Sequence, residues 1–338
     1  MTPSDLRPRG VVVVTDSDLP TEGVAERVLE AAGWTVRRAA CRTADDVREA
    51  AAGAVALIVQ WAPVDASVLA NLPDCRFVSR LGIGYDMIDV AAATEAGIPV
   101  ANVPDYCVEE VAAHTLAFVF SLTRRLPQLD AGLRAGRWAA SDDGDGARRP
   151  QGTTVAVLGH GRIGARVAQQ AASVGFDVLV HDPHVPAERV EAAGHVAVTL
   201  DEALERADVV SLHVPLTPQT RHLLDAPALA RMRPGSALVN TCRGGLVDET
   251  ALADALRSGQ LGAAALDVFE SEPLPADSPL RDAPNLLLSP HAAWYSPIAL
   301  LELEERAAQQ VADFLDGRPV PTIVNPGYAR VRADGAPV

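Results

Sequence analysis

The sequence predicts an α/β protein with two doubly wound parallel sheets, and three observations support this fold class. Short runs of apolar and β-branched residues alternate with alanine-rich stretches of helical periodicity, which is the pattern of parallel strands joined by helices. Proline breaks near residues 104 and 297, and a polar, glycine-rich stretch at 141–150 that is expected to be an exposed loop, interrupt this series. A length of 338 residues also favours two domains over one core.

The first hundred residues contain the strands of the first expected sheet. Helical patterns at 21–32 and 44–52 separate the early strands, so these strands are joined by crossovers and run parallel. The expected strands are 11–15, 34–39, 55–60, 77–81 and 99–102.

A second series of six strands follows, and six strands with helices between them match a complete doubly wound nucleotide-binding fold. A long helix at 107–126 precedes the series, and Glu109, Glu110 and His114 inside it argue against a membrane span. The expected strands are 154–158, 177–181, 208–213, 236–241, 263–268 and 285–289.

The last long helix is expected at 297–316, with Pro297 at its start and Gly317 just past its end. It comes too late to extend the second sheet, so we expect it to return to the first domain. The predicted domains are therefore a discontinuous one, 1–103 plus 297–338, and a continuous one, 104–296. A cleft between two such domains is the expected ligand site.

Composition excludes several classes of function. All 29 basic residues are arginine, so a pyridoxal Schiff base, a lysine nucleophile and a Walker-type phosphate lysine are impossible. A net charge of −15 disfavours nucleic-acid binding. The absence of an apolar run in residues 1–10 and of any C-x-x-C pair favours a cytoplasmic protein without a signal peptide, a disulfide framework or a zinc site. The four cysteines are Cys41, Cys75, Cys107 and Cys242.

A glycine-rich turn joins an expected strand to an expected helix in "VAVLGHGRIGARVA", residues 155–168. Gly159 permits the tight turn, Gly161 lets a pyrophosphate approach the backbone, and Gly164 lets the helix pack on the strand. Asp182 follows 18 residues after Gly164, at the end of the next strand, where a carboxylate binds ribose hydroxyls and repels a 2′-phosphate. The turn predicts a Rossmann-like domain that binds NAD rather than NADP. A glycine-rich turn without a ligand is the alternative.

Two histidines, His181 and His184, flank Asp182 and raise the question of a metal site. We interpret them as a strand-end residue and a loop residue, and we predict no metal site.

Polar groups suited to acid–base chemistry follow three later strands. "NTCRGGLVDE" supplies Arg243, "LDVFESEPLP" supplies Asp267, Glu270 and Glu272, and "SPHAAWYS" supplies His291. Reduction of a keto acid needs a cation for the carboxylate and carbonyl, which a guanidinium fork suits, and an acid near neutral pH, which an imidazole suits. A carboxylate behind the histidine would hold its tautomer. Taken singly, each residue has an ordinary alternative as a surface charge, a loop charge or a core histidine.

Together, "GHGRIG", "VNTCRGGLVDE", "ALDVFESEPLP" and "SPHAAWYS" resemble the D-2-hydroxyacid dehydrogenase family, and the resemblance extends to residues 80–90 and 100–118. It implies that Arg243 binds and polarises the substrate, that Glu272 orients His291, and that His291 is the acid/base. It also implies that the backbone of Ile83 and Gly84 and the side chain of Arg80 bind substrate. The cofactor-binding residues that it implies, together with the glycine turn, are Thr115, Gly159, Gly161, Arg162, Ile163, Gly164, Asp182, Pro215, Thr241, Cys242 and Asp267.

Within the family the sequence is most similar to the C-terminal-binding-protein branch, in which the tryptophan matched by Trp294 lines the pocket for the substrate side chain. Two departures affect this comparison: Ile83 replaces a serine of that branch, and Cys242 stands where the family commonly has alanine. The resemblance implies a homodimer formed through residues 107–138, with Leu133 and Trp138 as apolar contacts.

The leading hypothesis is an NAD-dependent D-2-hydroxyacid dehydrogenase that acts on a small 2-keto or 2-hydroxy acid. The rival from another class is an NAD(H)-sensing, corepressor-type scaffold with little turnover. A third possibility stays within enzymes, because relatives oxidise phosphite, formate or 3-phosphoglycerate; phosphoglycerate enzymes often carry a further regulatory domain, for which this length leaves no room.

Overall fold

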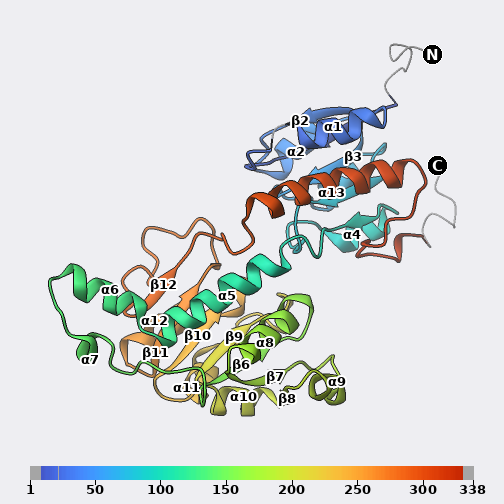
Figure 1. Ribbon diagram of the computed structural model, residues 1–338. Coiled ribbons are helices and arrows are strands. Elements are labelled where there is room, and N and C mark those ends of the chain that lie inside the picture. Colours follow the sequence, from blue (N-terminus) through green and yellow to red (C-terminus); the bar gives the residue numbers. More distant parts are fainter. Residues whose placement is uncertain (1–8, 22, 330–338) are drawn as a thin grey trace. The chain divides into compact units, whose positions relative to one another are not determined.

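The computed structural model of the chain describes residues 9–21 and 23–329. The chain forms two compact units, of which unit 1 combines Met1–Tyr106 with Ser296–Val338 and unit 2 is Cys107–Tyr295. Each unit is built on one parallel sheet with helices beside it (Figure 1). The predicted fold class of two doubly wound parallel sheets is therefore confirmed.

Unit 1 contains a five-stranded sheet in the order β2-β1-β3-β4-β5, which is the flavodoxin-like order. All of its strand pairs are parallel. The strands are β1 (Val11–Val14), β2 (Thr35–Arg38), β3 (Ala54–Val59), β4 (Phe77–Arg80) and β5 (Val100–Ala101).

The late helix α13 (Pro297–Leu315) completes unit 1, as expected from its position in the sequence. It packs beside α1 (Val24–Ala31) and against β3 and β4 (Figure 1). Phe314 of α13 stacks on Phe77 of β4 with ring centroids 4.6 Å apart. The helices α2 (Ala44–Ala50), α3 (Ala66–Ala70) and α4 (Val90–Glu95) pack in succession.

Unit 2 contains a seven-stranded parallel sheet in the order β12-β11-β10-β9-β6-β7-β8. The order reverses between β6 and β9, so the carboxyl ends of these two strands form the switch point at which doubly wound folds bind ligands. The strands are β6 (Thr154–Leu158), β7 (Asp177–His181), β8 (Val196–Ala197), β9 (Val209–Leu212), β10 (Ser236–Asn240), β11 (Leu261–Leu266) and β12 (Leu286–Leu288).

Helices cover both faces of this sheet, because its strands are apolar on both sides. One core lies under α5 (Val108–Thr123) and α8 (Arg162–Ser173), and the other lies under α10 (Leu200–Arg206), α11 (Ala226–Arg231) and α12 (Glu249–Arg257). The remaining elements of unit 2 are α6 (Leu126–Arg134), α7 (Ala140–Asp143), α9 (Ala187–Ala192) and the 3₁₀ helix η1 (Gly244–Leu246).

The sequence prediction missed one strand and one helical turn. A seventh strand, β8, pairs with β7 although it is only two residues long, too short to produce an alternating pattern. The stretch 141–150, predicted as an exposed loop, is a loop from residue 144 onward, but its first three residues belong to the short helix α7, whose Asp143 carboxylate pairs with Arg137 at 2.8 Å.

Among the described residues, no helix has both the length and the apolar character needed to cross a bilayer. None of the four cysteines, all of which lie in the described part of the chain, forms a disulfide. No group of three or more histidine, cysteine or acidic side chains in the described part of the chain has a metal-binding arrangement.

Candidate active site

The glycine turn lies at the switch point of unit 2, between β6 and α8. A Cβ atom on Gly159 would lie 2.3 Å from the His213 carbonyl oxygen, and one on Gly164 would lie 2.0 Å from the Gly159 carbonyl oxygen, so neither position tolerates a side chain. A Cβ atom on Gly161 would meet nothing within 4 Å. The turn therefore packs tightly against the protein at Gly159 and Gly164 and is open at Gly161. The first N–H groups of α8, which follow Gly161, have no intrahelical acceptors.

Asp182, one residue beyond β7, ties this turn to the neighbouring strand. One carboxylate oxygen accepts the His160 N–H at 2.7 Å, and the other accepts the His184 N–H at 2.9 Å. His181 bonds through Nδ1 to the Val198 carbonyl oxygen at 3.1 Å. The two histidines thus have the strand-end and loop roles predicted for them, and the partly exposed carboxylate lies beside the open glycine.

Arg243 follows β10 on a loop that Asn240 holds. The Asn240 amide donates to the Arg243 carbonyl oxygen at 2.8 Å, and its carbonyl oxygen accepts the Cys242 N–H at 3.0 Å. The next residue, Gly244, leaves no room for a side chain, because a Cβ atom there would lie 1.8 Å from the Phe269 carbonyl carbon. The guanidinium of Arg243 is partly exposed and donates to the Cys242 carbonyl oxygen at 2.7 Å.

The structure distinguishes between the two glutamates that follow β11. The Glu272 carboxylate lies 2.6 Å from Nδ1 of His291 and also accepts the Phe269 N–H at 3.0 Å. Glu270 instead bonds to Arg221 at 3.2 Å and to His222 at 3.1 Å. Glu272 is therefore the carboxylate behind His291.

Electrostatics favour a charged Glu272 and fix the tautomer of its partner. Burial alone would raise the pKa of Glu272, but the hydrogen bond and charge of His291, the Phe269 N–H and the charge of Arg243 lower it overall. A carboxylate can only accept hydrogen bonds, so Nδ1 of His291 carries a proton and donates to it. Nε2 of His291 is then the ring nitrogen that Glu272 does not engage.

His291 lies just past β12 with a φ of 51°, in the left-handed region that residues other than glycine rarely adopt. Its N–H donates to the Asp267 carbonyl oxygen at 2.7 Å. The Asp267 carboxylate accepts the N–H groups of Ala292 and Ala293, each at 2.8 Å. Asp267, which is 1% exposed, thus holds both the entry and the exit of the turn that carries His291.

Other predicted cofactor residues also lie at this edge of the sheet. The hydroxyl of Thr115, fully buried, bonds to the Val111 carbonyl oxygen and to the Thr241 hydroxyl, each at 2.8 Å. The Cys242 thiol donates to the Val214 carbonyl oxygen at 2.9 Å. Pro215, next along the chain, is exposed. The Thr115 hydroxyl and the Cys242 thiol thus already have hydrogen-bond partners within the protein.

Three predicted substrate residues, Arg80, Ile83 and Gly84, belong to unit 1. Arg80 is 5% exposed; its guanidinium lies 5.3 Å from the ring centre of Trp61 and donates to the Leu81 carbonyl oxygen at 2.6 Å. Gly82 must lack a side chain, because its φ is 142° and a Cβ atom would lie 1.2 Å from that guanidinium. Ile83 accepts the Asn102 amide at 2.7 Å through its carbonyl oxygen and, like Gly84, is partly exposed.

Sequence reasoning missed three residues of this site. Asn240 holds the Arg243 loop, Ser289 bonds to Asp267, and His114 bonds to Ser289. The asparagine of "VNTCRGG" at a strand end was a signal for the first. No local signal marks the other two, because their contact joins residues 175 positions apart.

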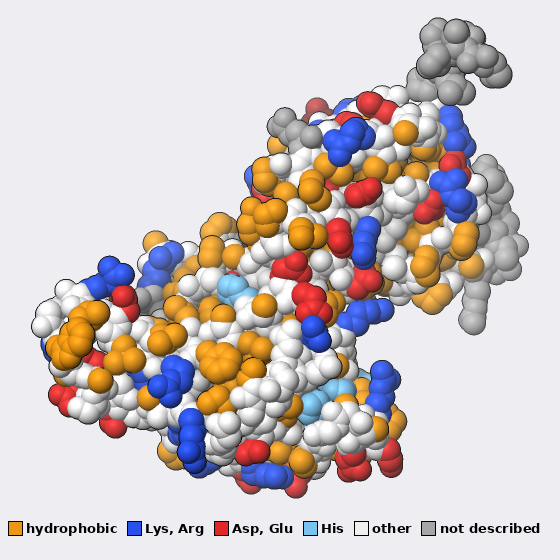
Figure 2. All heavy atoms as spheres, viewed as in Figure 1, with side chains coloured by type: hydrophobic (Ala, Val, Ile, Leu, Met, Phe, Trp, Pro, Cys, Tyr) orange, Lys and Arg blue, Asp and Glu red, His pale blue; other side chains and the backbone are white. Residues whose placement is uncertain are grey.

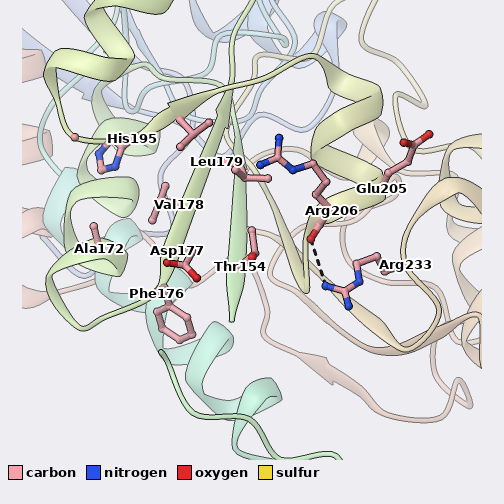
Figure 3. Close-up of a pocket in the computed structure, with 12 residues that line it drawn as sticks. Thr154, Ala172, Phe176, Asp177, Val178, Leu179, His195, Glu205, Arg206 and Arg233 are labelled. Carbon is pink, nitrogen blue, oxygen red and sulfur yellow. Dashed lines mark hydrogen bonds between the residues drawn. The ribbon is translucent and has the colours of Figure 1, made fainter. Parts of the chain in front are cut away.

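A separate pocket of about 660 Å³ lies at the opposite end of the same strands (Figure 3). Thr154 and Asp177, the first residues of β6 and β7, line it together with Arg206 and Arg233. Because ligands of doubly wound folds bind at the carboxyl ends of the strands, this pocket is not the reaction site. The Arg233 guanidinium is already engaged, at 2.9 Å from Asp208 and 3.4 Å from the Arg206 carbonyl oxygen.

Histidines that are shielded from water make unit 2 sensitive to acid. Loss of hydration lowers the pKa of His213 from 6.5 to about 3, and burial also lowers the pKa values of His160 and His195. The unfolded chain therefore takes up protons that the folded chain does not, and the free energy of unfolding should fall as the pH drops below about 6.5.

We expect His213→Gln, which keeps a polar group near Ser211, to weaken this dependence. Urea unfolding of both proteins from pH 8 to pH 5 measures it. Between pH 8 and pH 5 the free energy of unfolding should fall more in the wild type than in the variant. An equal fall in the two proteins would contradict the assignment of His213.

The similarity to known proteins covers most of unit 2 in one comparison and most of the chain in the others. The profile of "D-isomer specific 2-hydroxyacid dehydrogenase, NAD binding domain" matches residues 116–293. D-3-phosphoglycerate dehydrogenase of Mycobacterium bovis is 41% identical over 298 residues, which are 87% of this chain and 55% of that protein. The chain thus spans about half the length of the curated relatives it matches.

Solved structures agree with these matches. The TT0316 protein of Thermus thermophilus is 34% identical with a TM-score of 0.82, covering 93% of this chain and 99% of the other. D-lactate dehydrogenase of Aquifex aeolicus, solved with NAD and lactic acid, is 28% identical with a TM-score of 0.83, covering 90% of this chain and 96% of the other.

Proposed function

Because the chain belongs to the D-isomer specific 2-hydroxyacid dehydrogenase family, we propose that it is an NAD-dependent oxidoreductase that interconverts a 2-keto acid and a D-2-hydroxy acid. One observation carries the proposal. Arg243, Glu272 and His291 follow β10, β11 and β12, which are neighbours in the sheet, and His291 is bonded to Glu272 at 2.6 Å. Carboxyl ends of adjacent parallel strands lie at one edge, so the three groups share a site.

The chemistry of the residues follows from this arrangement. The Arg243 fork binds and polarises the carboxylate and carbonyl of the keto acid. His291 donates the Nε2 proton to the oxygen of C2 during reduction and removes it during oxidation. Glu272 accepts a hydrogen bond from the Nδ1–H group, fixes the ring and stabilises the imidazolium. The chemistry that a bound nicotinamide supplies is hydride transfer to or from C2.

The residues of unit 2 fit a dinucleotide. Gly161 opens onto free space beside the first N–H groups of α8, which suit phosphate oxygens. Asp182 offers a partly exposed carboxylate for ribose hydroxyls. We propose that Arg162 and Ile163 contribute N–H groups, and that Pro215, Thr241, Cys242 and Thr115 surround the cofactor. The buried Thr115 hydroxyl is expected to act through Thr241 rather than directly.

A carboxylate at Asp182 should select against a 2′-phosphate, because like charges in contact cost several kcal/mol. We expect kcat/KM with NADH to exceed that with NADPH by at least ~10-fold. Asp182→Asn keeps an acceptor for the His160 N–H and removes the charge. It should therefore lower the ratio of kcat/KM with NADH to kcat/KM with NADPH. Steady-state kinetics with both cofactors measure this, and an unchanged ratio in the variant would mean that another group sets the preference.

Two observations bear on the side chain of the substrate. Trp294, partly exposed three residues after His291, is an apolar wall that would favour a bulky side chain. The mycobacterial relatives are named for D-3-phosphoglycerate, itself a 2-hydroxy acid, so 3-phosphohydroxypyruvate belongs among the candidates. Arg80, Ile83 and Gly84 of unit 1 keep their proposed role in substrate binding. The assignment to the C-terminal-binding-protein branch stays a prediction.

Purified protein assayed with NADH against a panel of 2-keto acids tests the function. The panel should hold glyoxylate, pyruvate, 3-phosphohydroxypyruvate, and branched, thioether and aromatic acids. Turnover of at least one member is expected, with D-2-hydroxy acid as product. Protein that binds NADH and reduces none would favour the scaffold alternative.

We also propose that two copies of the chain pair through the 107–138 region. Trp138 is 92% exposed and Leu133 is 57% exposed. Figure 2 shows hydrophobic side chains gathered on the viewed face of unit 2 near α6. Such side chains are costly to leave in water and are typical of interfaces. Sedimentation should therefore give a dimer, which a Trp138→Ser, Leu133→Ser variant loses; a wild-type monomer at micromolar concentration would contradict this.

A further inference from the structure

The turn that carries His291 is anchored by a chain of polar contacts that begins on α5. His114 lies in α5, and its Nε2 is 3.1 Å from the Ser289 hydroxyl. Ser289 directly follows β12, and its hydroxyl donates to the Asp267 carboxylate. The same carboxylate accepts the N–H groups of Ala292 and Ala293.

The direction of each hydrogen bond follows from the groups involved. The Asp267 carboxylate only accepts, so the one hydroxyl proton of Ser289 is used on it. The Ser289 oxygen must then accept from His114, which fixes the proton on Nε2 of that imidazole. His114 therefore donates to Ser289, and Ser289 donates to Asp267, so the direction of both hydrogen bonds is fixed.

This chain of contacts matters because the turn is intrinsically unfavourable. His291 has a φ of 51°, and a non-glycine residue in the left-handed region persists only when its surroundings hold it. β12 gives little support, since it is a three-residue edge strand with partly exposed side chains. Helix α5 is a firm anchor in comparison: it packs on α8, β10 and β11, and the His114 ring contacts Phe118 edge-on at 4.5 Å.

We propose that His114 and Ser289 are positioning residues for His291, acting through Asp267. This inference rests on the proposed function, in which Nε2 of His291 transfers the proton. A catalytic group misplaced by about 1 Å can lose ~10²-fold in rate, so loss of either link should slow proton transfer without changing what binds.

Two matched pairs of variants test this. Ser289→Ala and His114→Phe each remove a link, whereas Ser289→Thr keeps the hydroxyl and His114→Gln keeps an N–H donor. We expect kcat for reduction to fall ~10- to ~100-fold in the first two, with the solvent deuterium isotope effect increased. KM for the keto acid and Kd for NADH should stay within about twofold of wild type. The conservative partners should recover kcat to within about threefold of wild type.

Two kinetic outcomes would overturn the proposal. Wild-type kcat in all four variants would show that the links do not position His291. An equal loss of kcat and of NADH affinity would show that Asp267 acts through the cofactor instead. If Ser289→Ala does not fold, the His114 pair carries the test alone.

A measurement without turnover separates this inference from the proposed function. The ring signal of His291 can be assigned by proton NMR from its disappearance in His291→Gln. It should move in Ser289→Ala and His114→Phe and keep its wild-type shift in the two conservative variants. An unmoved signal in all four overturns the positioning role, whereas a wild type that reduces no keto acid overturns only the proposed function.

Discussion

Replacement of Arg243 with alanine is expected to lower kcat/KM for keto-acid reduction by at least ~10²-fold, the usual cost of losing a charged donor that stabilises a developing oxyanion. The guanidinium is partly exposed beside β10, and Asn240 and Gly244 fix its loop. No other residue of the loop 241–245 is charged. The oxygen of C2, on which negative charge develops, would therefore lose the cation that this loop supplies.

Two further variants make the result specific. Arg243→Lys keeps the charge but loses the planar fork, so it should recover only part of the activity. Arg257→Ala removes an exposed arginine of α12 that pairs only with Asp254 and the Pro279 carbonyl oxygen in the described contacts, and it should leave kcat/KM unchanged. Wild-type turnover in Arg243→Ala would contradict the substrate-binding role proposed for this residue.

The common position of the three proposed catalytic groups could be predicted because parallel strands share a polarity. Once "NTCRGG", "LDVFESEP" and "SPHAAW" are placed after strands, their polar residues must lie at the same edge of the sheet. The strand order β10-β11-β12 then makes them neighbours. The same reasoning places Gly161 and Asp182 at the ends of β6 and β7.

Contacts within that edge could not be predicted from strand pattern and spacing; only the family resemblance pointed to Glu272 as the partner of His291. Glu270 and Glu272 differ by two positions in one loop, and spacing alone does not say which of them faces His291. The choice depends on the path of the loop, which sends Glu270 toward Arg221 and His222. The contact between His114 and Ser289 depends on how α5 packs on the sheet, a tertiary property with no sequence pattern of its own.

Replacement of His291 with glutamine is expected to lower kcat by ~10²- to ~10⁴-fold, because the amide cannot deliver a proton to the oxygen of C2. The loss should appear in kcat rather than in KM for the keto acid, because the proposed substrate-binding Arg243 is unchanged. Steady-state kinetics of both proteins with NADH and a keto acid measure this loss, and a wild-type kcat in His291→Gln would contradict the assignment of His291.

Glu272→Gln provides the companion test, since the paired carboxylate is what fixes Nδ1–H of His291. The pKa of Glu272 is lowered overall by its hydrogen bond to His291 and by nearby positive charge, so the carboxylate stays ionised at neutral pH and takes up a proton only as the pH falls through that lowered value. At pH 7 the variant should therefore lose much of kcat, while Glu270→Gln, a change at the carboxylate that faces Arg221, should lose little. Equal losses in both variants would mean that general negative charge near the site, rather than one bonded carboxylate, supports the imidazolium.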